Sequence, residues 1–184
     1  MKISAIIPTF NEEEHISEAI KSVSWADEII VVDSFSEDKT IEIAKKFGVK
    51  IIQREYKYSA SQKNWAIPQS EHNWIFLLDA DERVSNSLKK EILNWKKTKP
   101  KKQSYWIYRT NHFMGKKIKF SGWQGDKVIR LFHRDCRYED KKVHAEIENS
   151  SKAGKLKSPI LHFTFKSMSH YLLKWDQYSS WSAK

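Results

Sequence analysis

Cysteine and glycine are scarce in this sequence of 184 residues, and each scarcity excludes a class of protein. The single cysteine, Cys136, cannot form an intramolecular disulfide, so the fold is not a disulfide framework and a reducing compartment is expected. None of the predicted strand-to-helix turns holds a glycine-rich phosphate loop, which argues against nicotinamide-binding Rossmann enzymes and P-loop enzymes. The glycines are Gly48, Gly115, Gly122, Gly125 and Gly154.

Long apolar runs are also missing. No segment approaches the length of a membrane span, and Pro8 stops the apolar start of the chain before it reaches the length of a signal peptide. We therefore expect a soluble, cytoplasmic protein. Hydrophobic residues make up 40% of the sequence and aromatic residues 13%, so the chain can bury a core and is expected to form one domain over residues 1–184.

The charge is strongly one-sided, with a formal net charge of +10. Such an excess favours an anionic partner without specifying the anion. Lysines concentrate in residues 96–102, after a predicted helix. This run is either a solvated helix end and loop or a surface attracted to anionic lipid head groups, where each lysine contributes about 1 kcal/mol. The second reading implies a peripheral position on the inner face of a membrane.

Strand and helix patterns alternate over the first hundred residues. Strands are predicted at residues 2–7, 28–32, 49–53 and 74–78. Asn11 and Glu14 form a capping box before the first helix. Gly48 ends the second helix, and Ser85 caps the helix after the fourth strand. Repeated βα units with short connections indicate an α/β fold whose mainly parallel sheet is covered by helices on both faces.

Apolar stripes mark the buried helix faces. They comprise Ile16, Ala19, Ile20 and Val23 in the first helix, Ile41, Ala44 and Phe47 in the second, and Leu88, Ile92 and Trp95 in the fourth. Beyond Pro100, shorter strands at 105–109, 128–133 and 143–148 indicate a small antiparallel extension. The spacing of apolar residues over 168–178 predicts a C-terminal helix.

The apolar run at 74–78 ends in two carboxylates, Asp79 and Asp81. In an extended chain, residues i and i+2 point the same way, so both could contact one cation. Ligands of open α/β sheets bind beyond the carboxyl ends of strands, and hard oxygen ligands suit Mg²⁺ or Mn²⁺. Such a metal could neutralise a diphosphate in the absence of a glycine loop. Alternatively, the two aspartates only cap the turn before the helix at Ser85.

Three segments follow one another in a recognisable order: IIPTFNEE at 6–13, EIIVVDS at 28–34 and LLDAD at 77–81. They resemble the family 2 glycosyltransferases, which have the nucleotide-sugar-binding GT-A fold. Later segments resemble a branch that contains bacterial lipopolysaccharide-core β-glucosyltransferases. These segments are GWQGD at 122–126, RLF at 130–132, VHAE at 143–146 and LHFT at 161–164. The resemblance implies a nucleotide-sugar-binding half at 1–100 and an acceptor-side half at 101–184.

The resemblance also implies a nucleotide-sugar donor, with UDP as the expected nucleotide. Its base and ribose would be held by the loop after the first strand and by the acid after the second. The corresponding residues are Pro8, Thr9, Asn11, Glu13 and Asp33. Asp33 can accept the ring N–H of uracil. Lys63 stands where the family often has arginine and suits a phosphate, unless it is only a solvent-exposed helix lysine.

The implied reaction is a single inverting displacement by an acceptor hydroxyl on the anomeric carbon, with a carboxylate removing the hydroxyl proton. Asp126 is the first candidate base and Glu146 the second. Asp126 alternatively forms a salt bridge to Lys127 or Arg130. The expected acceptor is a cell-envelope glycan or a lipid-linked molecule such as lipopolysaccharide core.

The implied cofactor is Mg²⁺ or Mn²⁺ on Asp79 and Asp81, stabilising charge on the leaving phosphate. His144 and His162 are candidates for a third ligand or a diphosphate contact, and a structural role is the alternative for each. We place His162 with the metal. Trp123, Arg130 and His144 are assigned to substrate binding.

The sequence departs from the family pattern in several places. Phe35 and Lys39 replace glycines in the turn after Asp33, and because Phe35 disfavours positive φ, we expect a different turn there. Ala145 interrupts a Val-His-Glu motif. Family members usually continue beyond the position of Lys184, so a membrane-associating tail is expected to follow.

Three other functions stay open: a nucleotidyltransferase, a basic nucleic-acid-binding module, and a sugar-binding protein without turnover. A nucleotidyltransferase also pairs carboxylates with a metal and a nucleotide, but it releases pyrophosphate. The nucleic-acid reading leaves the acidic strand end unexplained, and the sequence lacks the aromatic and basic alternation typical of single-strand binding. We therefore expect no nucleic-acid partner.

Overall fold

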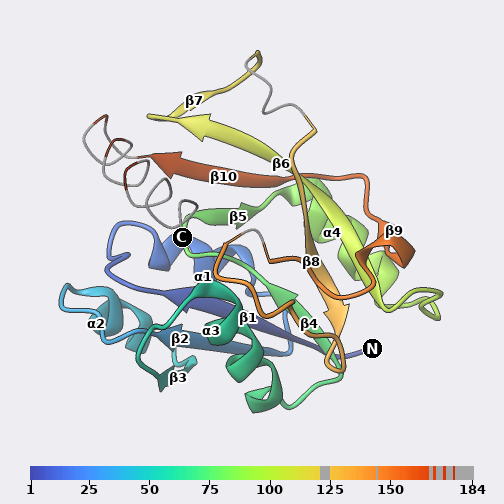
Figure 1. Cartoon of the computed structure of the whole chain (residues 1–184), viewed down its shortest axis with the longest axis horizontal. Helices are drawn as coiled ribbons and strands as arrows, with labels where there is room; N and C mark the ends of the chain where they lie inside the picture. Colours follow the sequence, from blue (N-terminus) through green and yellow to red (C-terminus); the bar gives the residue numbers. More distant parts are fainter. Residues whose placement is uncertain (121–124, 144, 166–167, 169–171, 173–175, 177–184) are drawn as a thin grey trace.

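The computed structural model describes residues 1–120, 125–143 and 145–165 and the single positions 168, 172 and 176. These residues form an α/β fold around a ten-stranded sheet with the path β3-β2-β1-β4-β8-β6-β10-β5 (Figure 1). Strands β7 and β9 each pair with β6 outside this path. The α/β class expected from the sequence is confirmed.

Four strands from the first hundred residues form the parallel half of the sheet. They are β1 (Ile3–Thr9), β2 (Glu28–Asp33), β3 (Lys50–Gln53) and β4 (Trp74–Leu77). β1 pairs in parallel with β2 and β4, and β2 pairs in parallel with β3. Because Thr9 lies opposite Asp33 in this register, the carboxyl ends of β1 and β2 meet at one edge. Ligands of open α/β sheets bind at this kind of edge.

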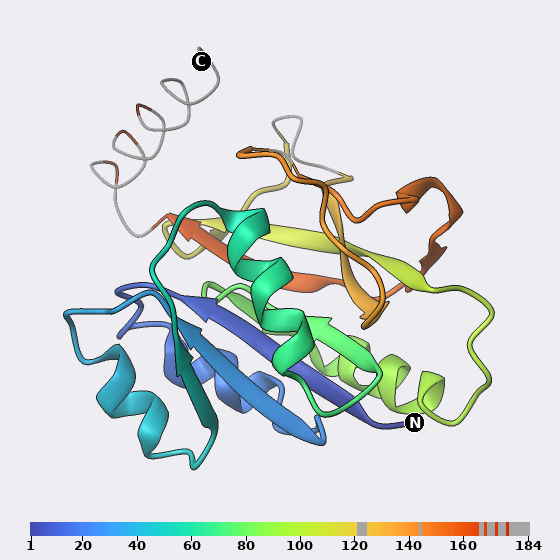
Figure 2. The same cartoon turned by 60° about the horizontal axis from the view of Figure 1, so that its bottom comes forward.

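Helices cover both faces of the parallel half, as predicted. α1 (Ile16–Ser22), α2 (Thr40–Lys45) and α4 (Asn86–Trp95) contribute to one apolar cluster with Phe76 of β4. α3 (Ser59–Ala66), followed by the 3₁₀ helix η1 (Ile67–Gln69), belongs to the other cluster. Alternate residues of β4 enter different clusters because successive strand side chains point to opposite faces. Figure 2 shows α3 crossing the near face of the sheet.

The remaining strands form the predicted antiparallel extension, with additions. β8 (Lys127–His133) lies antiparallel between β4 and β6 (Ser104–Phe113). β10 (Ile160–Phe165) pairs in parallel with β6 and antiparallel with β5 (Glu82–Val84), and neither β5 nor β10 was predicted. Short pieces complete this part: β7 (Lys116–Lys117), η2 (Ser150–Lys152) and β9 (Gly154–Lys155).

The predicted strand at 143–148 is wrong. Within its described residues, this segment makes only an isolated bridge, from Ile147 to Tyr138. Glu139 N donates to the Glu146 carbonyl and Glu148 N to the Arg137 carbonyl, each at 2.9 Å. The segment therefore pairs back on residues 137–139 in a loop of its own and does not join the sheet.

The predicted capping box at Asn11 is also wrong. α1 begins at Ile16, its N-cap is His15, and no side chain caps it. Asn11 lies in the left-handed region with φ +52°, which asparagine tolerates. Its Oδ1 accepts from Glu37 N and its N donates to Ser36 Oγ, each at 2.9 Å. Asn11 thus joins the loop after β1 to the loop after β2.

Phe35 adopts φ +61°, so the expectation that it resists positive φ is wrong. Asp33 holds the turn in this conformation, because its carboxylate accepts from the backbone N–H of Ser36 at 3.0 Å and from the Ser36 hydroxyl. These bonds offset a backbone cost of about 1–2 kcal/mol.

At the other predicted cap the expectation is confirmed. Ser85 Oγ accepts from Leu88 N at 3.2 Å, and the buried face of α4 is Leu88, Ile92 and Trp95. Tyr171, Trp175 and Tyr178 of the predicted C-terminal helix lie outside the described residues. In the described part of the chain, no helix is long and apolar enough to cross a bilayer.

Candidate active site

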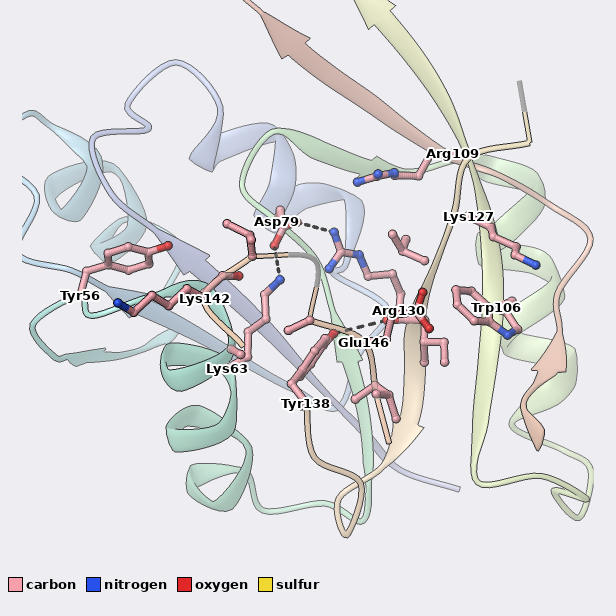
Figure 3. Close-up of a pocket in the computed structure, with 17 residues that line it drawn as sticks. Tyr56, Lys63, Asp79, Trp106, Arg109, Lys127, Arg130, Tyr138, Lys142 and Glu146 are labelled. Atoms are coloured by element: carbon pink, nitrogen blue, oxygen red, sulfur yellow. Dashed lines mark hydrogen bonds and ion pairs between the residues drawn. The ribbon is translucent and has the colours of Figure 1, made fainter. Parts of the chain in front are cut away.

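A cleft of about 610 Å³ opens at the carboxyl end of β4. α3 contributes Lys63, the segment after β4 contributes Asp79, and β8 contributes Arg130 (Figure 3). Trp106 and Arg109 of β6 form a further part of its wall. Residues 138, 142–143 and 145–147 also line it. The cleft therefore lies where the sheet topology predicts a ligand site.

Two cations hold Asp79 in this cleft. Lys63 Nζ lies 3.6 Å from Asp79 Oδ1, and an Arg130 guanidinium nitrogen donates to Oδ2; both side chains point to Asp79 in Figure 3. Burial alone would raise the pKa of Asp79, but the charges of Arg130 and Lys63 hold it far below its ordinary value. Burial lowers the pKa of Lys63, and Asp79 opposes this shift. Lys63 is 12% exposed, so the alternative of a solvent-exposed lysine is wrong.

Glu82 organises two arginines from beneath the cleft. Its carboxylate is fully buried, with Oε1 2.7 Å from Arg130 Nη2 and 3.6 Å from Arg109 Nη1. Its other oxygen accepts from Asp79 N at 3.1 Å. Burial lowers the pKa of Arg130, but Asp79 and Glu82 outweigh burial and raise it well above the ordinary value. Arg130 is therefore a buried, permanently charged group that supports Asp79 from within the protein.

Asp79 and Asp81 do not extend from one strand, so that premise is wrong. β4 ends at Leu77, and the chain turns where Glu82 N donates to the Asp79 carbonyl at 2.9 Å. Asp81 lies beside β10, with Oδ2 3.5 Å from His162 Nε2. Over the described residues, no three His, Cys, Asp or Glu side chains are grouped so that they could hold a metal ion.

A series of polar contacts runs from Asp81 to Asp126, and the two contacts that involve Asn111 are hydrogen bonds. His162 and Asn111 are register partners on β10 and β6, and His162 Nδ1 lies 2.7 Å from Asn111 Oδ1. Asn111 Nδ2 donates to Asp126 Oδ2 at 3.0 Å, and Asn111 is 5% exposed. On the other side of His162, the register partner is Glu82 of β5. Strand pairing thus aligns Glu82, His162 and Asn111 beside the turn of residues 79–82.

Asp126, the first candidate base, forms a bidentate ion pair. Arg109 Nε and Nη2 donate to its two oxygens at 2.8 and 2.9 Å. The predicted alternative, a salt bridge to Lys127 or Arg130, therefore names the wrong partner. Burial would raise the pKa of Asp126, but the hydrogen bonds from Arg109 and Asn111 lower it. The second candidate, Glu146, lines the cleft and accepts from Ser150 Oγ at 2.9 Å.

The predicted nucleotide-binding residues lie together at the ends of β1 and β2. Asp33 is fully buried, and Gln53 Nε2 donates to it at 2.9 Å. The Thr9 hydroxyl is buried and has no hydrogen-bond partner among the described residues. Pro8 is half-buried in β1, and Glu13 accepts from Lys39 N at 3.1 Å.

Two predicted site residues, Trp123 and His144, lie outside the described residues. Four candidates that the structure suggests were not predicted from the sequence. Phe10 and Phe35 are 55% and 51% exposed on the two loops that Asn11 joins. Arg109 and Asn111 were missed as well, although their i, i+2 spacing on one strand places them on the same face.

Comparison with known proteins adds a family and a fold. The family model described as Glycosyl transferase family 2 matches residues 4–127. An uncharacterized glycosyltransferase of Rickettsia bellii (strain RML369-C) is 46% identical over 92 residues, which are 50% of this chain and 31% of that protein. Lipopolysaccharide core biosynthesis glycosyltransferase LpsC of Rhizobium meliloti (strain 1021) is 26% identical over 201 residues, covering 100% of this chain and 71% of LpsC. The chain thus spans about a third of the Rickettsia relative.

Among solved structures, TarS 1–349 of S. aureus in complex with UDP-GlcNAc has a TM-score of 0.62 at 18% identity. The superposition covers 92% of this chain and 60% of that chain. The complex of TarS 1–349 with UDP has the same TM-score and covers 89% of this chain and 61% of that chain. At this level of identity the likeness shows the fold, and it confirms the GT-A type that the motifs implied.

Proposed function

The chain belongs to glycosyl transferase family 2, and on this premise we propose that it transfers a sugar from a UDP-sugar to a cell-envelope glycan or lipid-linked acceptor. The alignment with LpsC over the whole chain supports lipopolysaccharide core as the acceptor. The fold shared with TarS, which has been crystallised with UDP and UDP-GlcNAc, supports a uridine nucleotide. The observation that carries the proposal is the series of polar contacts from Asp81 through His162 and Asn111 to Asp126.

The side chains of Asp81 and His162 have ligand atoms that suit a divalent metal, Mg²⁺ or Mn²⁺. Asn111 gives its N–H to the Asp126 carboxylate, so its oxygen is left to accept the Nδ1–H of His162. A neutral His162 then has its lone pair on Nε2, facing the Asp81 carboxylate. Two acceptors facing each other repel, unless the ring is protonated or a cation is bound. An imidazole and a carboxylate are both ligands that Mn²⁺ and Mg²⁺ accept in proteins.

Only two such ligands come from the described residues, so we expect tight metal binding only together with the diphosphate of the donor. When bound, the metal stabilises the negative charge that grows on the leaving diphosphate. Asp79 is the other predicted ligand, and its carboxylate is held by Lys63 and Arg130. We propose that Asp79 positions the Lys63 ammonium toward the diphosphate.

Asp126 is the proposed general base. The acceptor hydroxyl oxygen bonds to the anomeric carbon while the bond from that carbon to the diphosphate oxygen breaks, and the hydroxyl proton passes to Asp126. This single displacement inverts the anomeric centre. The lowered pKa of Asp126 keeps the base deprotonated at neutral pH, at the cost of low basicity. Glu146 is the second candidate and lines the cleft described above.

The nucleoside is proposed to bind at the ends of β1 and β2. The unpartnered Thr9 hydroxyl is buried there and can bond to a ligand. Phe10 offers an exposed aromatic ring next to it for stacking on the base. Asp33 is fully buried and accepts hydrogen bonds from Ser36 and Gln53, so contact with uracil requires its carboxylate to become exposed.

A thermal-shift screen of nucleoside diphosphates, with and without Mn²⁺, tests this proposal. A ligand that binds the native state stabilises it by about 2.7 kcal/mol at one hundred times its Kd. We expect UDP and Mn²⁺ together to raise Tm by more than the sum of their separate effects. Asp81→Asn should abolish that excess, and Asp135→Asn, at an exposed carboxylate, should keep it.

Product analysis separates the rival enzyme class. With a UDP-sugar, release of UDP supports glycosyl transfer, whereas release of pyrophosphate identifies a nucleotidyltransferase. A chain that gives no response to any nucleoside diphosphate but binds RNA with strong salt dependence would contradict the proposal.

A further inference from the structure

The hairpin of β6 and β7 exposes apolar and basic side chains together. We call residues 113–120, with the sequence FMGKKIKF, the basic hairpin. Met114 is 53% exposed and Phe120 is 85% exposed. Between them lie the exposed lysines Lys116, Lys117 and Lys119, and the sequence has no acidic residue from 113 to 125. Met114 and Phe120 therefore contribute little to the core.

The turn of the basic hairpin holds Met114 in an unfavourable conformation. Met114 has φ +47° and Gly115 has φ +77°. Two-residue hairpin turns with both φ values positive favour Asn-Gly, because a larger side chain is strained there. A strained residue persists when the structure or the function requires it, and an exposed methionine gives no packing reason. The strain therefore indicates a role for an apolar side chain at the tip.

The basic hairpin lies at an outer edge of the molecule, close to the candidate active site along the chain. Among the described residues, β7 pairs with β6 alone, and Figure 1 shows it on the side away from β1, β2 and β3. Asn111 of β6 precedes Met114 of the turn by three residues, a separation of at most about 10 Å along the chain. A flat surface that touches the hairpin tip would thus lie near the contacts that join Asp81 to Asp126.

We propose that the basic hairpin docks on a bilayer that contains anionic phospholipid. Met114 and Phe120 enter the head-group region, and the lysines bind the lipid phosphates. Charge complementarity supports this partner, since the segment carries three lysines within four residues and the sequence from 113 to 125 contains no Asp or Glu. Met114 lies in the turn and Phe120 beyond β7, and apolar side chains separated in this way suit a fluid interface better than a protein groove. The surface goes beyond the proposed function; only its use for a lipid-borne acceptor rests on that function.

Vesicle co-sedimentation of the full chain tests the proposal without donor or acceptor. We expect binding to phosphatidylcholine vesicles that contain phosphatidylglycerol, little binding to phosphatidylcholine alone, and weakening by salt. Lys116→Gln with Lys117→Gln should weaken binding about tenfold or more. The matched control is Lys45→Gln with Lys46→Gln, two exposed neighbouring lysines at the end of α2, which Figure 1 shows on another side of the molecule. The control should bind as the parent chain does.

Two apolar substitutions separate docking from folding. Met114→Asn should leave Tm unchanged or raise it, because asparagine suits the turn, while it weakens vesicle binding severalfold. Phe120→Ser should weaken binding similarly. The proposal is overturned if the parent chain does not bind anionic vesicles, or if the control variant loses as much vesicle binding as the hairpin variants. An acidic protein would then be the partner to seek. The thermal shift with UDP and Mn²⁺ should survive every hairpin variant, so loss of that shift in the parent chain would count against the proposed function alone.

Discussion

Replacing Asn111 in two ways separates the two bonds that its amide makes. Asn111→Leu removes both the acceptor for His162 Nδ1 and the donor to Asp126. The imidazole then loses the partner that fixes its tautomer and ring orientation. Residues that orient a metal-binding histidine usually contribute 10–100-fold to metal affinity, which is about 1.4–2.7 kcal/mol. We expect a loss of that size in Mn²⁺ affinity, measured by calorimetric titration with UDP present.

Asn111→Asp keeps an acceptor for His162 and changes only the bond to Asp126. Mn²⁺ affinity should therefore stay within about threefold of the parent value, well short of the usual loss. A second carboxylate now faces Asp126 at the position of a donor that lay 3.0 Å away. Repulsion between the two raises the apparent pKa of the pair, so the acidic limb of the kcat profile should move to higher pH.

If the leucine variant binds Mn²⁺ as tightly as the parent chain in the presence of UDP, Asn111 does not orient a metal ligand. Equal losses of Mn²⁺ affinity in both variants would refute that role as well, since the acceptor retained in Asn111→Asp would then contribute nothing to metal binding. Urea unfolding serves as the control, because leaving His162 Nδ1 without a partner should cost about 1–3 kcal/mol and no more. A larger loss in the free energy of unfolding would mean that the substitution had disrupted the fold around the site.

Three further substitutions address stability, pH dependence and nucleotide binding. Glu82→Gln removes a fully buried charge between two arginines and should lower the free energy of unfolding by about 3–5 kcal/mol in urea titrations; a change below 1 kcal/mol would contradict the buried ion pair. Arg109 lowers the pKa of Asp126, so Arg109→Gln should raise that pKa and shift the acidic limb of kcat to higher pH, and an unmoved limb would place the base elsewhere. Phe10→Ala should raise the Kd of UDP about five- to hundredfold by removing a stacking surface, whereas Phe47→Ala, at another exposed aromatic, should leave it unchanged.

The parallel half of the fold could be predicted from the sequence because its signals are local. Apolar runs, the cap at Ser85 and the glycine at the end of α2 each act over a few residues, and the strands they predict are present. The prediction of a helix cap at Asn11 was wrong because the contact that decides its role is not local. Its amide is used by Glu37, on a loop that is distant in sequence and adjacent in space.

The candidate site was harder to predict because short elements position it. β5 has three residues, too few for a periodic pattern, yet it places Asp81 beside His162. The sequence could nominate Asp79, Asp81, Asp126 and His162 as candidates. It could not show that Arg130 and Lys63 hold Asp79, since those ion pairs join residues far apart in the chain.

The row of Glu82, His162 and Asn111 across three strands has a consequence for how such a protein can diversify. Backbone pairing aligns these side chains, so their relative positions do not depend on the length of the loops that join the strands. Insertions between β7 and β8 or between β8 and β10 could reshape the cleft for another acceptor while the row stays intact. Slippage of β10 by one residue would instead turn His162 to the opposite face, so selection should tolerate length changes in those loops and forbid them inside β10.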